Sequence, residues 1–142
     1  MPSPVSKRIL EAVDALPLYP GIRVIEVGSG PGVAAREINR RWPTAYVLGI
    51  DRSVKAVQQA VAGSLAQVKA GRLSFRHVAV EELELQPGER RYDLAFALRV
   101  GALDGRHPEL EAIALSRLAA CLSPQGRIFV DGGAPLRVLS AA

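Results

Sequence analysis

A carboxylate and three alternating glycines stand close together between positions 24 and 32. Glycines at alternate positions let the backbone turn sharply and bring its N–H groups against a ligand, because no Cβ stands in the way. The carboxylate lies two residues before the first glycine, where an apolar stretch ends. This pattern is typical of a nucleotide-type binding site. Its candidate contacts are Glu26, Gly28, Ser29, Gly30 and Gly32.

Two classes of ligand use such a turn. Gly30, Gly32 and Ala35 match the Gly-x-Gly-x-x-Ala fingerprint of dinucleotide sites, which makes NAD one candidate. A carboxylate near the turn would repel a pyrophosphate, whereas it would attract a ligand that presents a cation, such as an amino acid ammonium. Glu26 therefore favours an ammonium-bearing ligand over NAD.

The elements that must position these residues alternate between strands and helices. Short apolar runs predict strands at 23–27, 45–50, 73–79, 93–98 and 127–130. Helical periodicity predicts helices at 33–42 and 108–122, a long helix capped by Ser53 that reaches Val68, and a first helix capped by Ser3 with Pro4 at its first position. This alternation predicts an α/β fold, a doubly wound parallel sheet with helices on both faces.

Over residues 20–131 the pattern resembles the class I S-adenosylmethionine-dependent methyltransferases, whose fold is Rossmann-like. The resemblance implies S-adenosylmethionine as cofactor and the strand order 3-2-1-4-5. It implies that Glu26 and the glycine turn hold the methionine end of the cofactor. It also implies that Asp51, which ends the second strand, accepts hydrogen bonds from both ribose hydroxyls.

The adenine end of the implied site departs from the family's pattern. Ala79, beside Val80, stands where the family often has an acidic residue that binds the adenine amino group. Glu81 is the nearest carboxylate that can replace it, and a solvated surface position is the alternative for that residue. Arg52 stands where an apolar side chain commonly covers the adenine ring, so its guanidinium is expected to stack there.

The end of the fourth strand bears on the methyl acceptor. The resemblance places Leu98 and Arg99 near the sulfonium. Family members that methylate amino groups of nucleic acid bases often carry Asn or Asp before Pro-Pro-aromatic at this point, and here the sequence is Leu-Arg-Val-Gly-Ala. A hydroxyl, carboxyl or carbon acceptor on a small molecule is therefore expected. Asp104 and His107 are the candidate general bases, with a helix cap or surface position as the alternative for His107.

Composition limits the remaining possibilities. The chain has 142 residues, the size of one domain (1–142), with two histidines and one cysteine, so no zinc cluster is expected. The net charge is +4, but the cations are spread along the chain without interleaved aromatics, so a nucleic acid partner is not expected. The lone Cys121 and the lack of an 18-residue apolar run favour a cytoplasmic protein without a membrane span.

The last eleven residues raise a question about the edge of the sheet. Family members usually continue with two more strands after the fifth, whereas only residues 132–142 remain here. An apolar strand at an open edge needs cover. We expect this cover from a short strand at 136–139, or from a homodimer or partner chain that uses the fifth strand and the tail. Two functions follow: a methyltransferase acting on a small molecule, or a shortened cofactor-binding subunit or regulator without its own activity.

Overall fold

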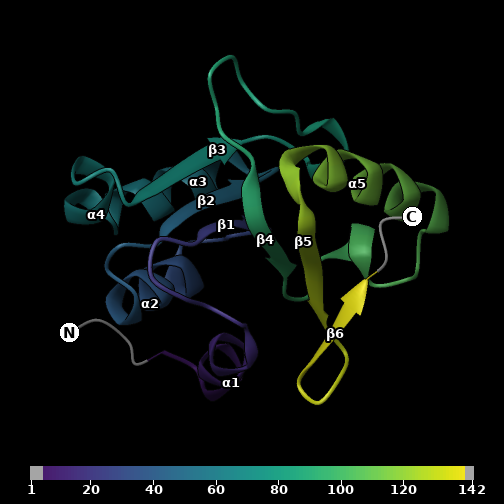
Figure 1. Cartoon of the computed structure of the whole chain (residues 1–142), viewed down its shortest axis with the longest axis horizontal. Helices are drawn as coiled ribbons and strands as arrows, with labels where there is room; N and C mark the ends of the chain where they lie inside the picture. The colour runs from purple at the N-terminus through teal and green to yellow at the C-terminus, as the bar shows by residue number, and fades with distance from the viewer. Residues whose placement is uncertain (1–4, 140–142) are drawn as a thin grey trace.

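The computed structural model describes residues 5–139, and six strands form one sheet in the order β3-β2-β1-β4-β5-β6. Strands β1 to β5 pair in parallel, and β6 pairs antiparallel with β5. The predicted doubly wound sheet and its order 3-2-1-4-5 are confirmed, with β6 added at the edge (Figure 1). The strands are β1 (Arg23–Val27), β2 (Tyr46–Asp51), β3 (Leu73–His77), β4 (Tyr92–Ala97), β5 (Leu122–Asp131) and β6 (Leu136–Leu139).

The helices follow the predicted alternation with two differences. The first helix begins at Lys7, where the Ser6 hydroxyl accepts from the amide of Ile9 at 3.3 Å; the predicted cap Ser3 lies outside the described residues. The helix that Ser53 caps is divided at Gly63 and Ser64 instead of continuing to Val68. The helices are α1 (Lys7–Ala15), α2 (Val33–Arg41), α3 (Val54–Ala62), α4 (Leu65–Lys69), η1 (Val80–Glu82), η2 (Gly101–Leu103) and α5 (Pro108–Cys121).

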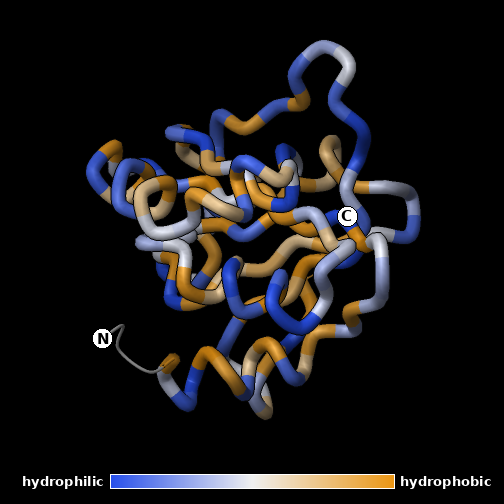
Figure 2. Tube along the Cα trace, turned by 90° about the vertical axis from the view of Figure 1, so that its left-hand side faces the viewer, coloured by the Kyte–Doolittle hydropathy of each residue, from blue (hydrophilic) through white to orange (hydrophobic). Residues whose placement is uncertain are grey.

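Two hydrophobic cores cover the two faces of the sheet. On one face, strand residues such as Val24 and Phe96 pack with α1 and α2, and on the other Ile25 and Val27 pack with α5. Figure 1 shows α1 and α2 on one side of the strands and α5 on the other. In Figure 2 hydrophobic and hydrophilic positions alternate along α1, as expected for a helix with one buried side. None of the helices in the described part of the chain is long and apolar enough to span a membrane.

Strand β6 answers the question of the exposed edge. Leu136 to Leu139 lie opposite Asp131 to Ile128, so the outer edge of β5 is paired within the chain. This is the first of the two expected covers, the short strand. The other expected cover, a homodimer or partner chain, stays a prediction.

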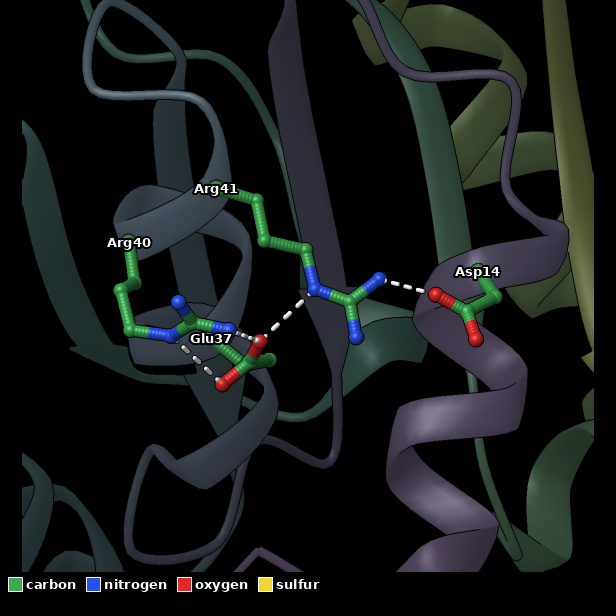
Figure 3. A network of polar contacts seen from close by, with 4 residues as sticks. All are labelled: Asp14, Glu37, Arg40 and Arg41. Atoms are coloured by element: carbon green, nitrogen blue, oxygen red, sulfur yellow. Dashed lines mark hydrogen bonds and ion pairs between the residues drawn. The ribbon is translucent and has the colours of Figure 1, made fainter.

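A polar network joins α1 to α2 (Figure 3). Glu37 is 5% exposed, and its carboxylate accepts from Arg40 Nη2 at 2.5 Å and from Arg41 Nε at 2.7 Å. Arg41 also pairs with Asp14 of α1. The hydrogen bond from Arg40, with that from Arg41, holds the pKa of Glu37 below its usual value against the opposing effect of burial. The network fixes the helix that begins at the glycine turn.

We predict that Glu37→Gln lowers the free energy of unfolding by about 1–2 kcal/mol at neutral pH, since charge-assisted hydrogen bonds are lost. A depressed pKa stabilises the fold only while the carboxyl is ionised, so the difference is full above the ordinary value of 4.5 and is lost as the pH falls through the folded-state pKa. Urea unfolding at several pH values measures it. Glu11→Gln, in an exposed pair with Lys7, is the matched control and should change little. A decrease in the free energy of unfolding of Glu37→Gln that is the same at all pH values would contradict the lowered pKa of Glu37.

Candidate functional site

The carboxyl ends of the parallel strands open onto one cavity of about 390 Å³. In open parallel sheets this edge is where ligands bind. Seven of the thirteen site residues predicted from the sequence line it: Gly28, Asp51, Arg52, Ala79, Val80, Arg99 and His107. The other six lie outside its lining: Glu26, Ser29, Gly30, Gly32, Leu98 and Asp104.

The glycine turn connects β1 to α2 and is fastened to β2. The amides of Gly28 and Ser29 both donate to the carbonyl of Ile50, at 2.8 and 3.0 Å. Gly28, Gly30 and Gly32 have φ values of 70°, 54° and 87°, in the left-handed region that favours glycine. A Cβ at Gly28 would lie 2.7 Å from Val100 Cγ2, whereas one at Gly30 would meet nothing within 4 Å. The turn is therefore tightly packed at Gly28 and open at Gly30.

Glu26 lies beneath this turn, on the α2 face of the sheet. Its side chain is buried, and its Oε1 atom has no hydrogen-bond partner among the described residues. Burial, with a smaller contribution from Asp51, raises the pKa of Glu26 to about 8, although a backbone hydrogen bond from Ala35 and the charge of Arg36 oppose this. A buried carboxyl without a full set of partners is costly, and a cationic ligand would satisfy it.

Ser29 shares this unsatisfied condition. Its Oγ is buried and has no partner in the described part of the chain. Among residues 5–139 three buried side-chain atoms have no hydrogen-bond partner: Glu26 Oε1, Ser29 Oγ and Asn39 Oδ1. Two of these three atoms belong to the glycine turn or to the end of β1 that leads into it. Buried polar atoms without partners need an explanation, and a ligand that forms hydrogen bonds with them is one explanation.

Asp51 ends β2 and holds the turn through its side chain. Its Oδ2 accepts from the amide of Gly30 at 2.9 Å, and its Oδ1 accepts from the amide of Ser53 at 2.9 Å. Each carboxylate oxygen can accept more than one hydrogen bond, so both retain capacity for donors from a ligand. The two backbone contacts fix the carboxylate at the wall of the cavity.

The far wall is formed by the segments that follow β2 and β3. Arg52, which follows β2, is exposed and borders the cavity. Ala79 and Val80, which follow β3, line it as well. Glu81 also lines the cavity, so a carboxylate is present although Ala79 has none. The Nε2 atom of His77 lies 3.0 Å from the carbonyl oxygen of Arg52, and this contact connects the two segments.

The segment after β4 closes the cavity from the other side. Arg99 is the one residue other than glycine with positive φ, 56°, in the described part of the chain, and its amide donates to Asp131 Oδ1 at 3.1 Å. Such strained residues concentrate at functional sites. Leu98 instead packs in the core on the α2 face, because side chains alternate along a strand and it follows Phe96 by two.

The two candidate bases differ in position. His107 lines the cavity at the start of α5. Asp104 lies outside the lining and accepts from the amide of Arg106 at 3.0 Å and from its Nε at 2.6 Å. The backbone hydrogen bond from Arg106, together with its side chain, lowers the pKa of Asp104, which makes this carboxylate a weaker base. Within residues 5–139 no group of three or more His, Cys, Asp or Glu residues is arranged to hold a metal ion.

Sequence reasoning missed several apolar residues of the cavity. They are Val27, Ile50, Val78, Val100, Gly101, Ala102 and Leu110. Most of them directly precede or follow residues that were predicted, so their positions next to strand ends could have identified them as residues of the cavity. Leu110 lies three residues after His107 and shares its side of the first turn of α5, which helical spacing also indicates.

Comparison with known proteins agrees with this geometry. Two curated relatives are the trans-aconitate 2-methyltransferases of Pseudomonas paraeruginosa and Streptomyces avermitilis. The first is 33% identical over 120 residues, 83% of this chain and 38% of that protein. The second is 39% identical over 67 residues, 47% of this chain and 24% of that protein. The chain thus spans well under half the length of either relative.

Solved structures show the same likeness. A methyltransferase from Thiobacillus denitrificans in complex with S-adenosyl-L-homocysteine has a TM-score of 0.69 and 25% identity over 89% of this chain and 48% of that one. The family model described as "Methyltransferase domain" matches residues 24–126, which include β1 to β4, α5 and the whole glycine turn. The chain therefore belongs to the methyltransferase domain family.

Proposed function

We propose that the chain binds S-adenosylmethionine and transfers its methyl group to a carboxylate of a small organic acid. The observation that carries the proposal is the buried carboxylate of Glu26, unsatisfied at Oε1, beneath a glycine turn. An amino acid ammonium supplies the positive charge that this carboxylate lacks. The similarity to a structure solved with S-adenosyl-L-homocysteine and to enzymes named trans-aconitate 2-methyltransferase supports the cofactor and the acceptor class.

The chain's residues divide the work of binding such a cofactor. Glu26 and the amides of the glycine turn hold the methionine end, and Asp51 accepts from the ribose hydroxyls. Arg52, Ala79 and Val80 enclose the adenine, with Glu81 as the carboxylate nearest its amino group. Arg99 and the residues that follow it line the part of the cavity where the sulfonium of the cofactor would lie. These roles are proposals that the positions of these residues at the cavity and the turn support.

The cofactor supplies an electrophilic methyl group, so the protein contributes alignment and exclusion of water. A carboxylate acceptor is already ionised near neutral pH. Such an acceptor would need no proton removed before it received the methyl group, and the cofactor would leave as S-adenosylhomocysteine. This agrees with the weak candidate bases: His107 borders the cavity and Asp104 is held by Arg106.

The competing function is a cofactor-binding subunit or regulator without its own activity. The volume of the cavity favours it, since about 390 Å³ is at the small end of the range for ligand sites. Calorimetric titration with S-adenosyl-L-homocysteine and NAD, followed by mass spectrometry of trans-aconitate and related acids incubated with S-adenosylmethionine, separates the possibilities. Tighter binding of NAD contradicts the cofactor assignment. Cofactor binding without methylated acid supports the competing function.

Two further expectations stay predictions. A homodimer or partner chain would use the fifth strand or residues 134–139, now through the outer edge of β6. Sedimentation at micromolar concentration tests this, and a monomer with full activity would contradict it. The cytoplasmic location also stays a prediction.

We predict that Asp51→Asn weakens binding of S-adenosyl-L-homocysteine by about 1.5–3 kcal/mol, because charge-assisted hydrogen bonds to the ribose become neutral. The isosteric amide keeps the size of the side chain, and calorimetry measures the affinity. Asp14→Asn, which removes a carboxylate far from the cavity, is the control. Unchanged affinity in Asp51→Asn would remove this residue from the site.

We predict that binding of S-adenosyl-L-homocysteine releases a proton near pH 7. With its pKa at about 8, Glu26 is mainly protonated in the free protein, and the ligand's ammonium requires it to ionise. Calorimetry in buffers of different ionisation enthalpy measures this release. In Glu26→Gln the release should disappear and binding should weaken. Proton release that persists in Glu26→Gln would assign it to another group.

The same pKa predicts a cost to stability. A carboxyl whose pKa is raised in the folded state keeps its proton there, so stability falls as the pH rises from the ordinary value of 4.5 toward about 8. Urea unfolding across this range should show a shallower fall in Glu26→Gln than in the wild-type chain. Parallel pH profiles would contradict the raised pKa.

A further inference from the structure

Arg36 of α2 connects the glycine turn to a distant part of the chain. Its Nη1 donates to the carbonyl of Pro31 at 2.7 Å and to Ser64 Oγ at 2.9 Å. Pro31 lies between Gly30 and Gly32 in the turn, and Ser64 is fully buried where α3 gives way to α4. One nitrogen atom thus joins the ligand-binding turn to the junction of two helices.

The space around this guanidinium is kept open by two glycines. An added Cβ would lie 2.8 Å from Arg36 Nη1 at Gly32 and 3.1 Å from it at Gly63. Gly32 needs to be glycine for its positive φ alone, but Gly63 has a φ of −82° that any residue adopts. A side chain at Gly63 would therefore require the guanidinium of Arg36 to shift.

The bonding of Arg36 is unusual for a half-buried cation. Its two acceptors are a carbonyl and a hydroxyl rather than a carboxylate. Desolvation lowers the pKa of Arg36, and the charge of Glu26 opposes this. Among residues 5–139 no carboxylate forms an ion pair with Arg36, and Arg36 and Glu26 are close enough for each to affect the pKa of the other.

We infer that Arg36 is a positioning residue for the ligand site: it holds the Pro31 carbonyl, and thereby the amides of the glycine turn, in the binding geometry, while Ser64 and Gly63 hold Arg36. The inference rests on the proposed function in so far as this turn binds the cofactor. It gives a role to Gly63 and Ser64, the two residues at which the predicted long helix is divided.

Calorimetric titration with S-adenosyl-L-homocysteine tests the inference. Arg36→Gln should weaken binding by about tenfold or more, the loss of hydrogen bonds from a charged donor, and Arg36→Lys should restore part of it. Gly63→Ala, which touches neither the turn nor the cavity, should weaken binding in the wild-type chain by displacing the guanidinium. It should change little in the Arg36→Gln background. Arg40→Gln, on the same helix and paired with Glu37, is the matched control.

Hydrogen exchange in the free protein gives a readout that needs no ligand. The Gly32 amide donates to the Ser29 carbonyl at 3.0 Å and the Gly30 amide to Asp51. Both should exchange faster in Arg36→Gln than in Arg40→Gln, with exchange in β1 unchanged. Wild-type exchange at these amides, or a Gly63→Ala effect that is the same with and without Arg36, overturns the inference. Failure of the wild-type chain to bind S-adenosyl-L-homocysteine overturns the proposed function instead, and the exchange rates still decide the role of Arg36.

Discussion

A carboxyl group buried without a full set of partners is the constraint around which this molecule is organised. Glu26 stands at the end of the central strand, between the sheet and α2, where burial raises its pKa to about 8. A side chain that only filled the core there would be apolar, as Val24 is two residues earlier. The unfavourable burial of Glu26 is understandable if the folded chain is completed by a cation at this position. On the proposed function, the burial of Glu26 thus lowers the stability of the fold at a residue that serves binding.

The elements around Glu26 hold the glycine turn in place above it. Three glycines with positive φ carry the chain from β1 into α2, and Asp51 and the Ile50 carbonyl fasten this turn to β2. Arg36 of α2 donates a hydrogen bond to the Pro31 carbonyl in the turn. The far end of the same helix is held to α1 by the network of Glu37, Arg40, Arg41 and Asp14. The contact of α2 that acts on the turn directly is thus that of Arg36, whereas the network holds the other end of the helix to α1.

Sequence reasoning succeeded where one local pattern determines the structure. The range 23–27 for the first strand was correct to the residue, because a short, mainly apolar run ends there at a glycine turn. Asp51 lies at the end of the second strand, where the family resemblance placed it. The sequence did not reveal the division of the helix after Ser53, since the apolar spacing of Val54, Val61 and Val68 continues across Gly63 and Ser64. The wall formed by Val100, Gly101 and Ala102 was also missed, because its position depends on how the segment after β4 folds back over Gly28.

The titration of Glu26 itself tests its role most directly. Carbon-13 NMR of the Glu26 carboxyl carbon follows its ionisation with and without saturating S-adenosyl-L-homocysteine. We expect a pKa near 8 in the free protein, because the carboxyl is buried, and a pKa well below that in the complex, because an ammonium lies beside it. A Glu26 carboxyl that titrates at the ordinary value of 4.5 in the free chain, or whose pKa does not change on binding, would contradict this role.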